Sequence, residues 1–136
     1  MKGYGMEVIN THWAVESCLK LVRAGVFSKK EHDEILHPDI LLLKNFPRHE
    51  KFANSKFWGL ASIRGKIIKH GFKMKWHNMG NGKIQLRLAV AIINHKAILC
   101  QWYVKGDDKT EQRELNKFKI KIQKIIENEY EVRGML

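Results

Sequence analysis

Between residues 72 and 105 the sequence alternates between apolar and mixed positions, and this alternation constrains the fold more than any other feature. The apolar side chains occupy the even positions: Phe72, Met74, Trp76, Ile84, Leu86, Leu88, Val90, Ile92, Ile98, Cys100, Trp102 and Val104. Because neighbouring side chains of a β-strand point to opposite faces of its sheet, the pattern predicts strands that are buried on one face. Turn-like interruptions at residues 79–83 and 94–96 divide the segment into three strands of an antiparallel meander.

The turns also predict which residues of the meander lie side by side. A hairpin centred on Asn81 places Lys75 opposite Arg87, and a second hairpin centred on His95 places Arg87 opposite Tyr103. Residues directly opposite each other share a face and have Cβ atoms about 5 Å apart. A slip of one residue would turn the apolar set toward water, so the alternation itself favours this register. We therefore expect the cations at odd positions to gather on the outer, exposed face of the sheet.

Capping signals predict the elements that precede the meander. A helix capped by Asn10 or Thr11 runs to about Ala24, and residues 3–9 form a short edge strand before it. A capping box at residues 28–31 then starts a second helix, in which a hydroxyl and a carboxylate each bond a free backbone N–H. We expect this second helix to be short and to end before the first proline.

Two further helices are predicted on either side of the meander. Residues 55–70 carry apolar side chains three and four positions apart and are followed by a glycine, which is typical of a helix and its end. A capping box at residues 108–111 opens a final helix. Its apolar stripe consists of Leu115, Phe118, Ile122, Ile125 and Ile126. Helices must cover the apolar face of the meander, which predicts an α+β fold.

The fold class expected for residues 1–136 is a single α+β domain. It combines N-terminal helices, a three- to four-stranded antiparallel sheet and a C-terminal helix. The sequence has no apolar stretch that predicts a signal peptide or a membrane span. Its two cysteines, Cys18 and Cys100, lack the spacing of a metal or redox motif, so we expect a reducing, cytoplasmic setting.

A formal net charge of +11 and a pI near 9.8 indicate a polyanionic partner, such as RNA or an acidic protein. On the predicted outer face, Arg87 and Lys75 are suited to stabilise the charge of a phosphorane during RNA cleavage. His77 or Tyr103, or a lysine of lowered pKa, would move the protons, and neither a metal nor a cofactor is required. Further nucleic-acid contacts are expected from Lys73, Lys105, Arg64 and Lys69.

Simpler interpretations of the same residues stay open. A basic sheet face is most often a solvated surface, and a histidine at a strand end, such as His77, is more often a surface residue than a catalyst. Trp76 and Trp102 occupy apolar positions, so they are expected in the core rather than as platforms for base stacking. The seven histidines do not form a recognised metal motif.

Three segments resemble the RelE/ParE superfamily of toxins, especially its HigB-like members. They read KMKWHN, KIQLRLAVAII and KAILCQWYVKGDDKT, and a charged helix from Glu111 follows, so the resemblance spans roughly residues 55–127. It implies an mRNA endonuclease that halts translation, free or on the ribosome, and an acidic antitoxin that covers the basic face. The family's strand arginine corresponds to Arg87 and its preceding basic residues to Lys73 and Lys75. Tyr103 or His77 takes the acid/base position.

Two other functions fit the same composition. The first is a nucleic-acid-binding protein without catalysis, from a phage or another mobile element. The second is an inhibitor or effector that binds an acidic host enzyme through the basic face. RelE/ParE relatives include proteins that poison gyrase without cleaving RNA, so the resemblance alone does not choose between these functions.

Overall fold

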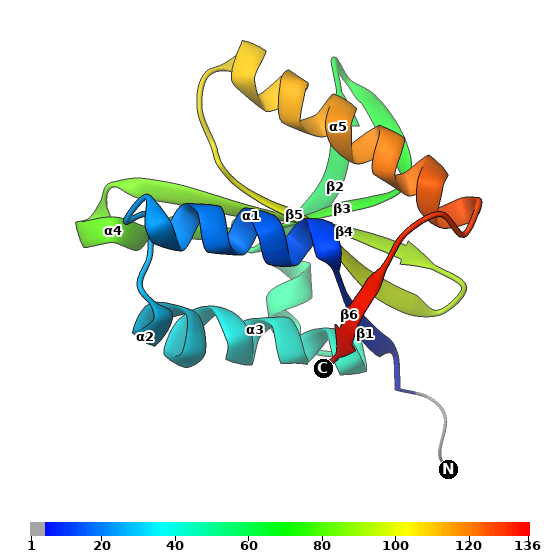
Figure 1. The fold of residues 1–136 in the computed structure, drawn as a ribbon, viewed down its shortest axis with the longest axis horizontal. Coiled ribbons are helices and arrows are strands. Elements are labelled where there is room, and N and C mark those ends of the chain that lie inside the picture. The colour runs from blue at the N-terminus through cyan, green and yellow to red at the C-terminus, as the bar shows by residue number, and fades with distance from the viewer. Residues whose placement is uncertain (1–4) are drawn as a thin grey trace.

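The computed structural model describes residues 5–136, which form a sheet with helices on both faces (Figure 1). The strands are β1 (Glu7–Thr11), β2 (Trp58–Ile63), β3 (Lys66–Asn78), β4 (Ile84–Ile93), β5 (Lys96–Val104) and β6 (Val132–Met135). The helices are α1 (His12–Arg23), α2 (Lys29–Glu31), α3 (His37–Leu41), α4 (Met79–Gly82) and α5 (Asp108–Ile126). A π-helical turn (His32–Leu36) joins α2 to α3, and 3₁₀ turns occupy Leu42–Asn45 and Glu50–Ala53. None of the described helices is long and apolar enough to cross a membrane.

The sheet is larger than the sequence indicated. Its six strands follow the order β2-β3-β4-β5-β1-β6, and β1 pairs with β5 in parallel. The prediction of a three- to four-stranded antiparallel sheet is therefore wrong, although the fold combines helices and strands as expected. The N-terminal strand was also expected at an edge, over residues 3–9. It starts at Glu7, lies between β5 and β6, and leaves the predicted residues 3 and 4 outside the described part of the chain.

The predicted helix over residues 55–70 is wrong, because most of this segment forms a β-hairpin. β2 and the first half of β3 pair through a tight turn at Arg64 and Gly65, where φ is +51° and +80°. Positive φ at both central residues gives a turn that matches the twist of paired strands. The stacked rings of Trp58 and Phe72, 5.1 Å apart, join β2 to β3. Such cross-strand contacts favour the strand conformation over the helix that the spacing of the apolar residues predicted.

Most of the even-numbered side chains of the meander form a core, as predicted. Met74, Leu86 and Leu88 have no exposed surface. Trp76 and Trp102 lie on the same face with stacked rings 5.4 Å apart, which confirms that they are core residues. The segment from α2 through the 3₁₀ turns covers this face, below the sheet in Figure 1.

A second core fills the opposite face, which the sequence predicted to be the open one. α5 lies across this face, above the sheet in Figure 1, and buries the apolar stripe predicted for it except Ile126, which is 53% exposed. Phe118 is fully buried and packs against Gly71, where an added Cβ would lie 3.0 Å from the Phe118 ring. The small side chains of Ala89 and Ala91 belong to the same cluster and let α5 approach the sheet.

One irregularity in β5 explains why the alternation did not reveal this second core. Ala89 pairs with Gln101 but the next residue, Val90, pairs with Leu99, so Cys100 is an extra residue in the strand. Such a bulge places the residues before it on the opposite faces from those that simple alternation predicts. Cys100 and Ile98 therefore pack against α5 rather than in the first core.

Local capping agrees with the sequence at several positions. Thr11 caps α1 by accepting the Ala14 N–H, and the capping box of Ser28 and Glu31 is present. Two boundaries differ. The helical segment continues past Pro38, which lies in the first turn of α3, directly after the π-helical turn. The final helix is capped by the residue before the predicted box, Asp107, whose side chain accepts the Thr110 N–H at 2.8 Å.

Candidate nucleic-acid interface

Three neighbouring strands bring several predicted site residues together on the face that α5 covers. Lys75 on β3 lies opposite Arg87 on β4, and Arg87 lies opposite Tyr103 on β5. The predicted register of these residues is therefore confirmed. Lys73 lies two residues before Lys75 on β3, and Lys105 directly follows β5. We refer to Lys73, Lys75, Arg87 and Lys105 as the basic cluster.

The face that carries the basic cluster is not open, because the first turn of α5 closes over Tyr103. Tyr103 and Arg87 each have only 4% of their surface exposed, so the prediction that both lie on a solvent-exposed face is wrong. The Tyr103 hydroxyl donates a hydrogen bond of 3.0 Å to Glu111 Oε2. Burial, followed by the charge of Glu111, raises the pKa of Tyr103. The phenol keeps its proton and links β5 to α5.

Glu111 is the carboxylate that α5 adds to this arrangement. Its Oε2 atom lies 3.5 Å from Lys73 Nζ, and the two side chains are only 14% and 18% exposed. Within residues 5–136, no other carboxylate forms a salt bridge with the basic cluster. Its Oε1 atom is buried and accepts no hydrogen bond from the described residues. Glu111 is therefore the one salt-bridge carboxylate, within residues 5–136, for the four cations of the basic cluster, and its Oε1 atom can still accept a hydrogen bond.

Arg87 is a buried cation with neutral hydrogen-bond partners. Its Nη1 donates to the Leu86 carbonyl and its Nη2 donates to Gln85 Oε1, both at 3.1 Å. Burial lowers the pKa of Arg87, and the nearby Tyr103 and Glu111 act in the opposite direction. A buried cation is costly when no counter-charge lies close to it. Arg87 forms no salt bridge within the described chain, so an anion that binds close to its guanidinium group would stabilise it.

Lys75 lies next to the buried Arg87 and is itself only partly buried. Its Nζ donates a hydrogen bond of 2.9 Å to the Ser55 carbonyl, just before β2. Gly59 leaves room for this side chain, since a Cβ there would lie 3.3 Å from Lys75 Nζ. Burial lowers the pKa of Lys75, and Lys73, Arg87 and Lys105 lower it further in that order. The four cations are thus close enough to repel one another, and a bound anion would relieve this repulsion.

His77 lies two residues beyond Lys75 on β3 and is exposed. Its Nε2 lies 2.6 Å from the Lys56 carbonyl oxygen, so the ring is held against the segment that precedes β2. This contact fixes the ring beside the basic cluster, and it assigns the proton to Nε2 because a carbonyl oxygen only accepts. A proton-transfer role for His77 would use the other ring nitrogen.

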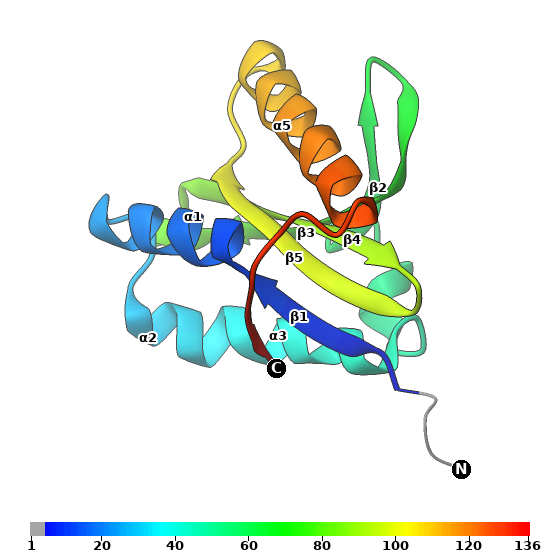
Figure 2. The ribbon, with the colours of Figure 1, turned by 45° about the vertical axis from the view of Figure 1, so that its right-hand side comes forward.

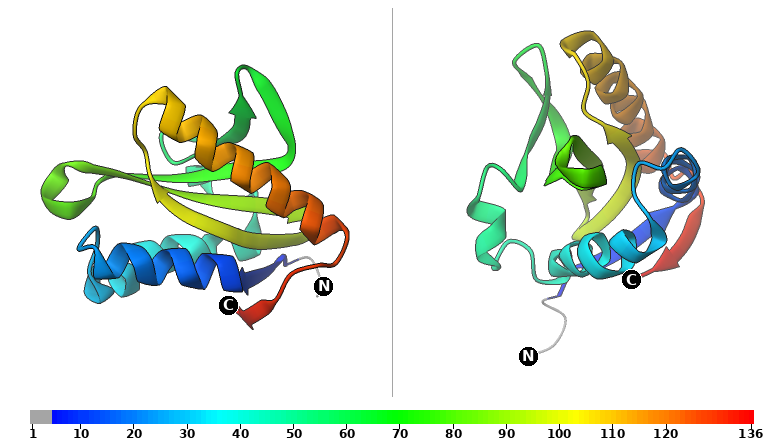
Figure 3. Two further views of the ribbon diagram at one scale, coloured as in Figure 1. Left: turned by 45° about the horizontal axis from the view of Figure 1, so that its top comes forward. Right: turned by 90° about the vertical axis from the view of Figure 1, so that its left-hand side faces the viewer.

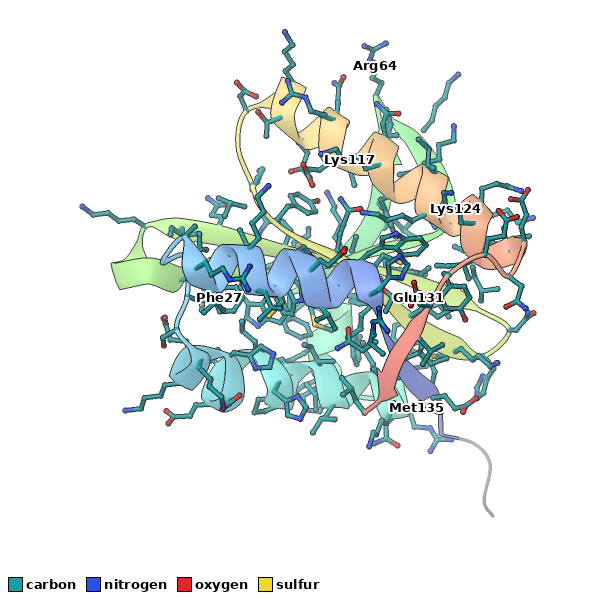
Figure 4. All side chains as sticks on the ribbon, in the orientation of Figure 1. Phe27, Arg64, Lys117, Lys124, Glu131 and Met135 are labelled. Atoms are coloured by element: carbon teal, nitrogen blue, oxygen red, sulfur yellow. The ribbon has the colours of Figure 1, made fainter. Side chains whose placement is uncertain are left out.

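Arg64 and Lys69 lie apart from the basic cluster, because the segment that carries them is a hairpin rather than a helix. Arg64 lies in the turn between β2 and β3, and its Nε donates to Gln112 Oε1 on α5 at 3.3 Å. Figure 4 shows Arg64 at the outer end of the hairpin, beside the helix that carries Lys117 and Lys124. These two predicted nucleic-acid contacts belong to a different surface.

Glu111 and Ser55 are the residues of this arrangement that the sequence did not single out. Glu111 was assigned only a capping role, and its contact with Tyr103 depends on α5 folding back over β5. A sequence signal for this does exist, since an apolar stripe along a charged helix predicts that the helix buries one face. Within residues 5–136, no group of three or more histidine, cysteine or acidic side chains is arranged to hold a metal ion.

Comparison with known proteins does not assign this chain to a family: no family model, no curated protein and no solved structure matches it. The resemblance to the RelE/ParE superfamily therefore stays a prediction.

Proposed function

We propose that the basic cluster binds the phosphate groups of RNA. The observation that carries this proposal is the charge balance of the site: four cations lie around a single carboxylate, Glu111. An excess of three positive charges in a half-buried position is unfavourable for the free protein. Phosphates are the anions that such a cluster of lysines, at the surface of a chain of net charge +11, is best suited to bind.

The choice of RNA over DNA rests on the resemblance to the RelE/ParE superfamily, in which the basic strand residues act on mRNA. In this proposal Lys75 and Lys105 contact phosphate oxygens directly. Arg87, which is buried, supplies positive charge from beneath the site. We place this activity in the cytoplasm, where the free thiols of Cys18 and Cys100 would stay reduced.

The proposal is tested by fluorescence anisotropy with a labelled single-stranded RNA and a DNA of the same sequence. The double variant Lys75→Ala/Lys105→Ala should bind RNA at least tenfold more weakly, because two phosphate contacts of about 1 kcal/mol each are lost. Lys30→Ala is the control for the loss of a remote lysine, since Lys30 is an exposed lysine of α2, on the other face of the sheet (Figure 1). If the double variant and the control bind RNA with equal affinity, the site assignment is wrong. If the wild-type protein binds the DNA as tightly as the RNA, the preference for RNA is wrong.

Cleavage of the bound RNA is a second candidate, and the lowered pKa of Lys75 favours it. A neutral amine at Lys75 would take the proton of a 2′-hydroxyl, whose oxygen then bonds to the adjacent phosphorus. The bond from phosphorus to the 5′-oxygen breaks, and this oxygen takes a proton from water or, if both ring nitrogens of His77 are protonated, from its Nδ1 atom. The products carry a 2′,3′-cyclic phosphate and a 5′-hydroxyl. A denaturing gel of the bound RNA, for wild type and Lys75→Ala, separates cleavage from binding alone.

A further inference from the structure

A groove separate from the basic cluster runs between the β2–β3 hairpin and the C-terminal part of α5. Figures 2 and 3 show the hairpin standing beside α5 in several views. The groove has a volume of about 500 Å³ and is lined from both sides, by residues of the hairpin from Ile63 to His70 and of α5 from Asn116 to Ile126. The basic cluster contacts α5 at its first turn, through Glu111, so the two surfaces meet different halves of the same helix.

The walls of the groove are aliphatic and partly exposed. Ile67 on β3 has 64% of its surface exposed, and Ile126 at the end of α5 has 53% exposed. Ile68 and Ile122, which are buried, form the deeper part of the lining. Among the residues that the structure describes, no phenylalanine, tyrosine or tryptophan lines the groove, so they offer no broad aromatic platform for bases. Aliphatic side chains of another protein are the better match for such walls.

The rim of the groove is strongly basic. Arg64, Lys66, Lys69 and Lys119 all line it, and no aspartate or glutamate of the described chain does. Within residues 5–136, none of these four cations forms a salt bridge. A second copy of the chain would bring the same cations against them, which like-charge repulsion opposes. The complementary occupant is a segment that is apolar on one side and acidic on the other.

We infer that this groove docks an acidic, amphipathic segment of a partner protein. The apolar side chains of the segment fill the space between Ile67 and Ile126, and its carboxylates pair with the basic rim. Docking in an apolar groove with charged edges is a common mode of peptide recognition, in which apolar anchors give affinity and the charges give specificity. The inference does not depend on RNA binding, because none of the lining residues belongs to the basic cluster.

The probe for this site is a synthetic helical peptide of about 16 residues with leucines along one face and glutamates on the other. Its affinity is measured by fluorescence anisotropy, and the bound region by hydrogen exchange. Two control peptides replace all glutamates by lysine or all leucines by serine. We expect binding of the first peptide alone, with protection of the hairpin and the second half of α5.

Matched pairs of substitutions on exposed positions locate the site. Lys119→Glu, on the rim, should weaken binding of the acidic peptide by about fivefold or more, since a charge pair becomes a like-charge contact. Lys124→Glu makes the same charge change on the same helix outside the groove lining and should have a smaller effect. Likewise, Ile126→Gln should weaken binding, whereas Ile120→Gln, at a position that is 59% exposed outside the groove, should not.

Three results would overturn the inference. The first is equal binding of the acidic and the lysine peptide, or equal effects within each matched pair. The second is self-association in sedimentation that Ile126→Gln abolishes, which would assign the groove to a second copy. The third is weaker RNA binding by Ile126→Gln than by Ile120→Gln, which would assign the groove to nucleic acid. Circular dichroism melts of all four variants exclude loss of folding as the cause.

Discussion

Replacing Glu111 by glutamine should change the stability and the RNA affinity of this protein in opposite directions. Glu111→Gln keeps a side chain that accepts the Tyr103 hydrogen bond but removes the only salt-bridge carboxylate of the basic cluster within residues 5–136. Lys73 and Arg87, both mostly buried, would then lack their nearest counter-charge. Breaking a buried ion pair costs about 3–5 kcal/mol, and the partial exposure of Lys73 reduces our expectation to about 2–3 kcal/mol.

The same change should tighten RNA binding. A unit negative charge about 8 Å from a phosphate, at an effective dielectric constant of about 20, repels it by about 2 kcal/mol before salt screening. Removing Glu111 should therefore increase RNA affinity by about five- to tenfold. Added phosphate or RNA should also restore part of the lost stability, because a ligand that binds only the folded state stabilises it.

Urea denaturation followed by tryptophan fluorescence measures the first effect, and anisotropy with labelled RNA measures the second. Glu34→Gln is the matched control, because Glu34 is an exposed glutamate of the π-helical turn and the substitution makes the same change in net charge. A Glu111→Gln protein that is as stable as the control, or that binds RNA no more tightly than the control, would refute the reasoning about this site.

Three further outcomes are expected. RNA affinity should fall as the pH is raised toward about 10, because the lowered pKa of Lys75 causes it to lose its charge below the usual value of about 10.4, and Lys75→Arg should flatten this profile in anisotropy titrations. Phe118→Ala should cost about 3–5 kcal/mol in urea denaturation, because Phe118 is fully buried between α5 and the sheet. Thr11→Ala should cost about 1–2 kcal/mol, because the Thr11 hydroxyl caps α1 and donates to the Leu99 carbonyl, and Thr11→Ser should recover most of this loss.

The sequence predicted the centre of the sheet well, because alternation and register are local properties. The pair of Lys75 and Arg87 follows from the position of the first turn. The pair of Arg87 and Tyr103 was predicted from a turn centred on His95, but the turn consists of Asn94 and His95, and the extra residue Cys100 in β5 restores the predicted register. The second turn is tight, with Asn94 and His95 both at positive φ. The helix after the meander was also predictable, since its apolar stripe and its acidic cap lie within one segment.

The hairpin of β2 and β3 could not be predicted in the same way. The apolar residues of this segment satisfy helical spacing, and the contacts that decide for strands are with residues further along the chain. Trp58 stacks on Phe72, and Leu60 pairs with Phe72 across the two strands. A local pattern contains no information on such partners. The exposed basic face was mispredicted for a related reason. The apolar stripe of α5 shows that this helix buries one face, but it does not show that the helix covers Tyr103 and brings Glu111 against it.

The salt dependence of RNA binding tests the central claim most directly. Each phosphate contact on a single strand contributes a slope of about −0.7 to a plot of log affinity against log salt concentration. Lys75→Ala/Lys105→Ala should therefore reduce the slope of the wild-type protein by about 1.4, whereas Lys30→Ala should leave it unchanged. A double variant with the wild-type slope would contradict the account, because RNA would then be held by other cations of the surface.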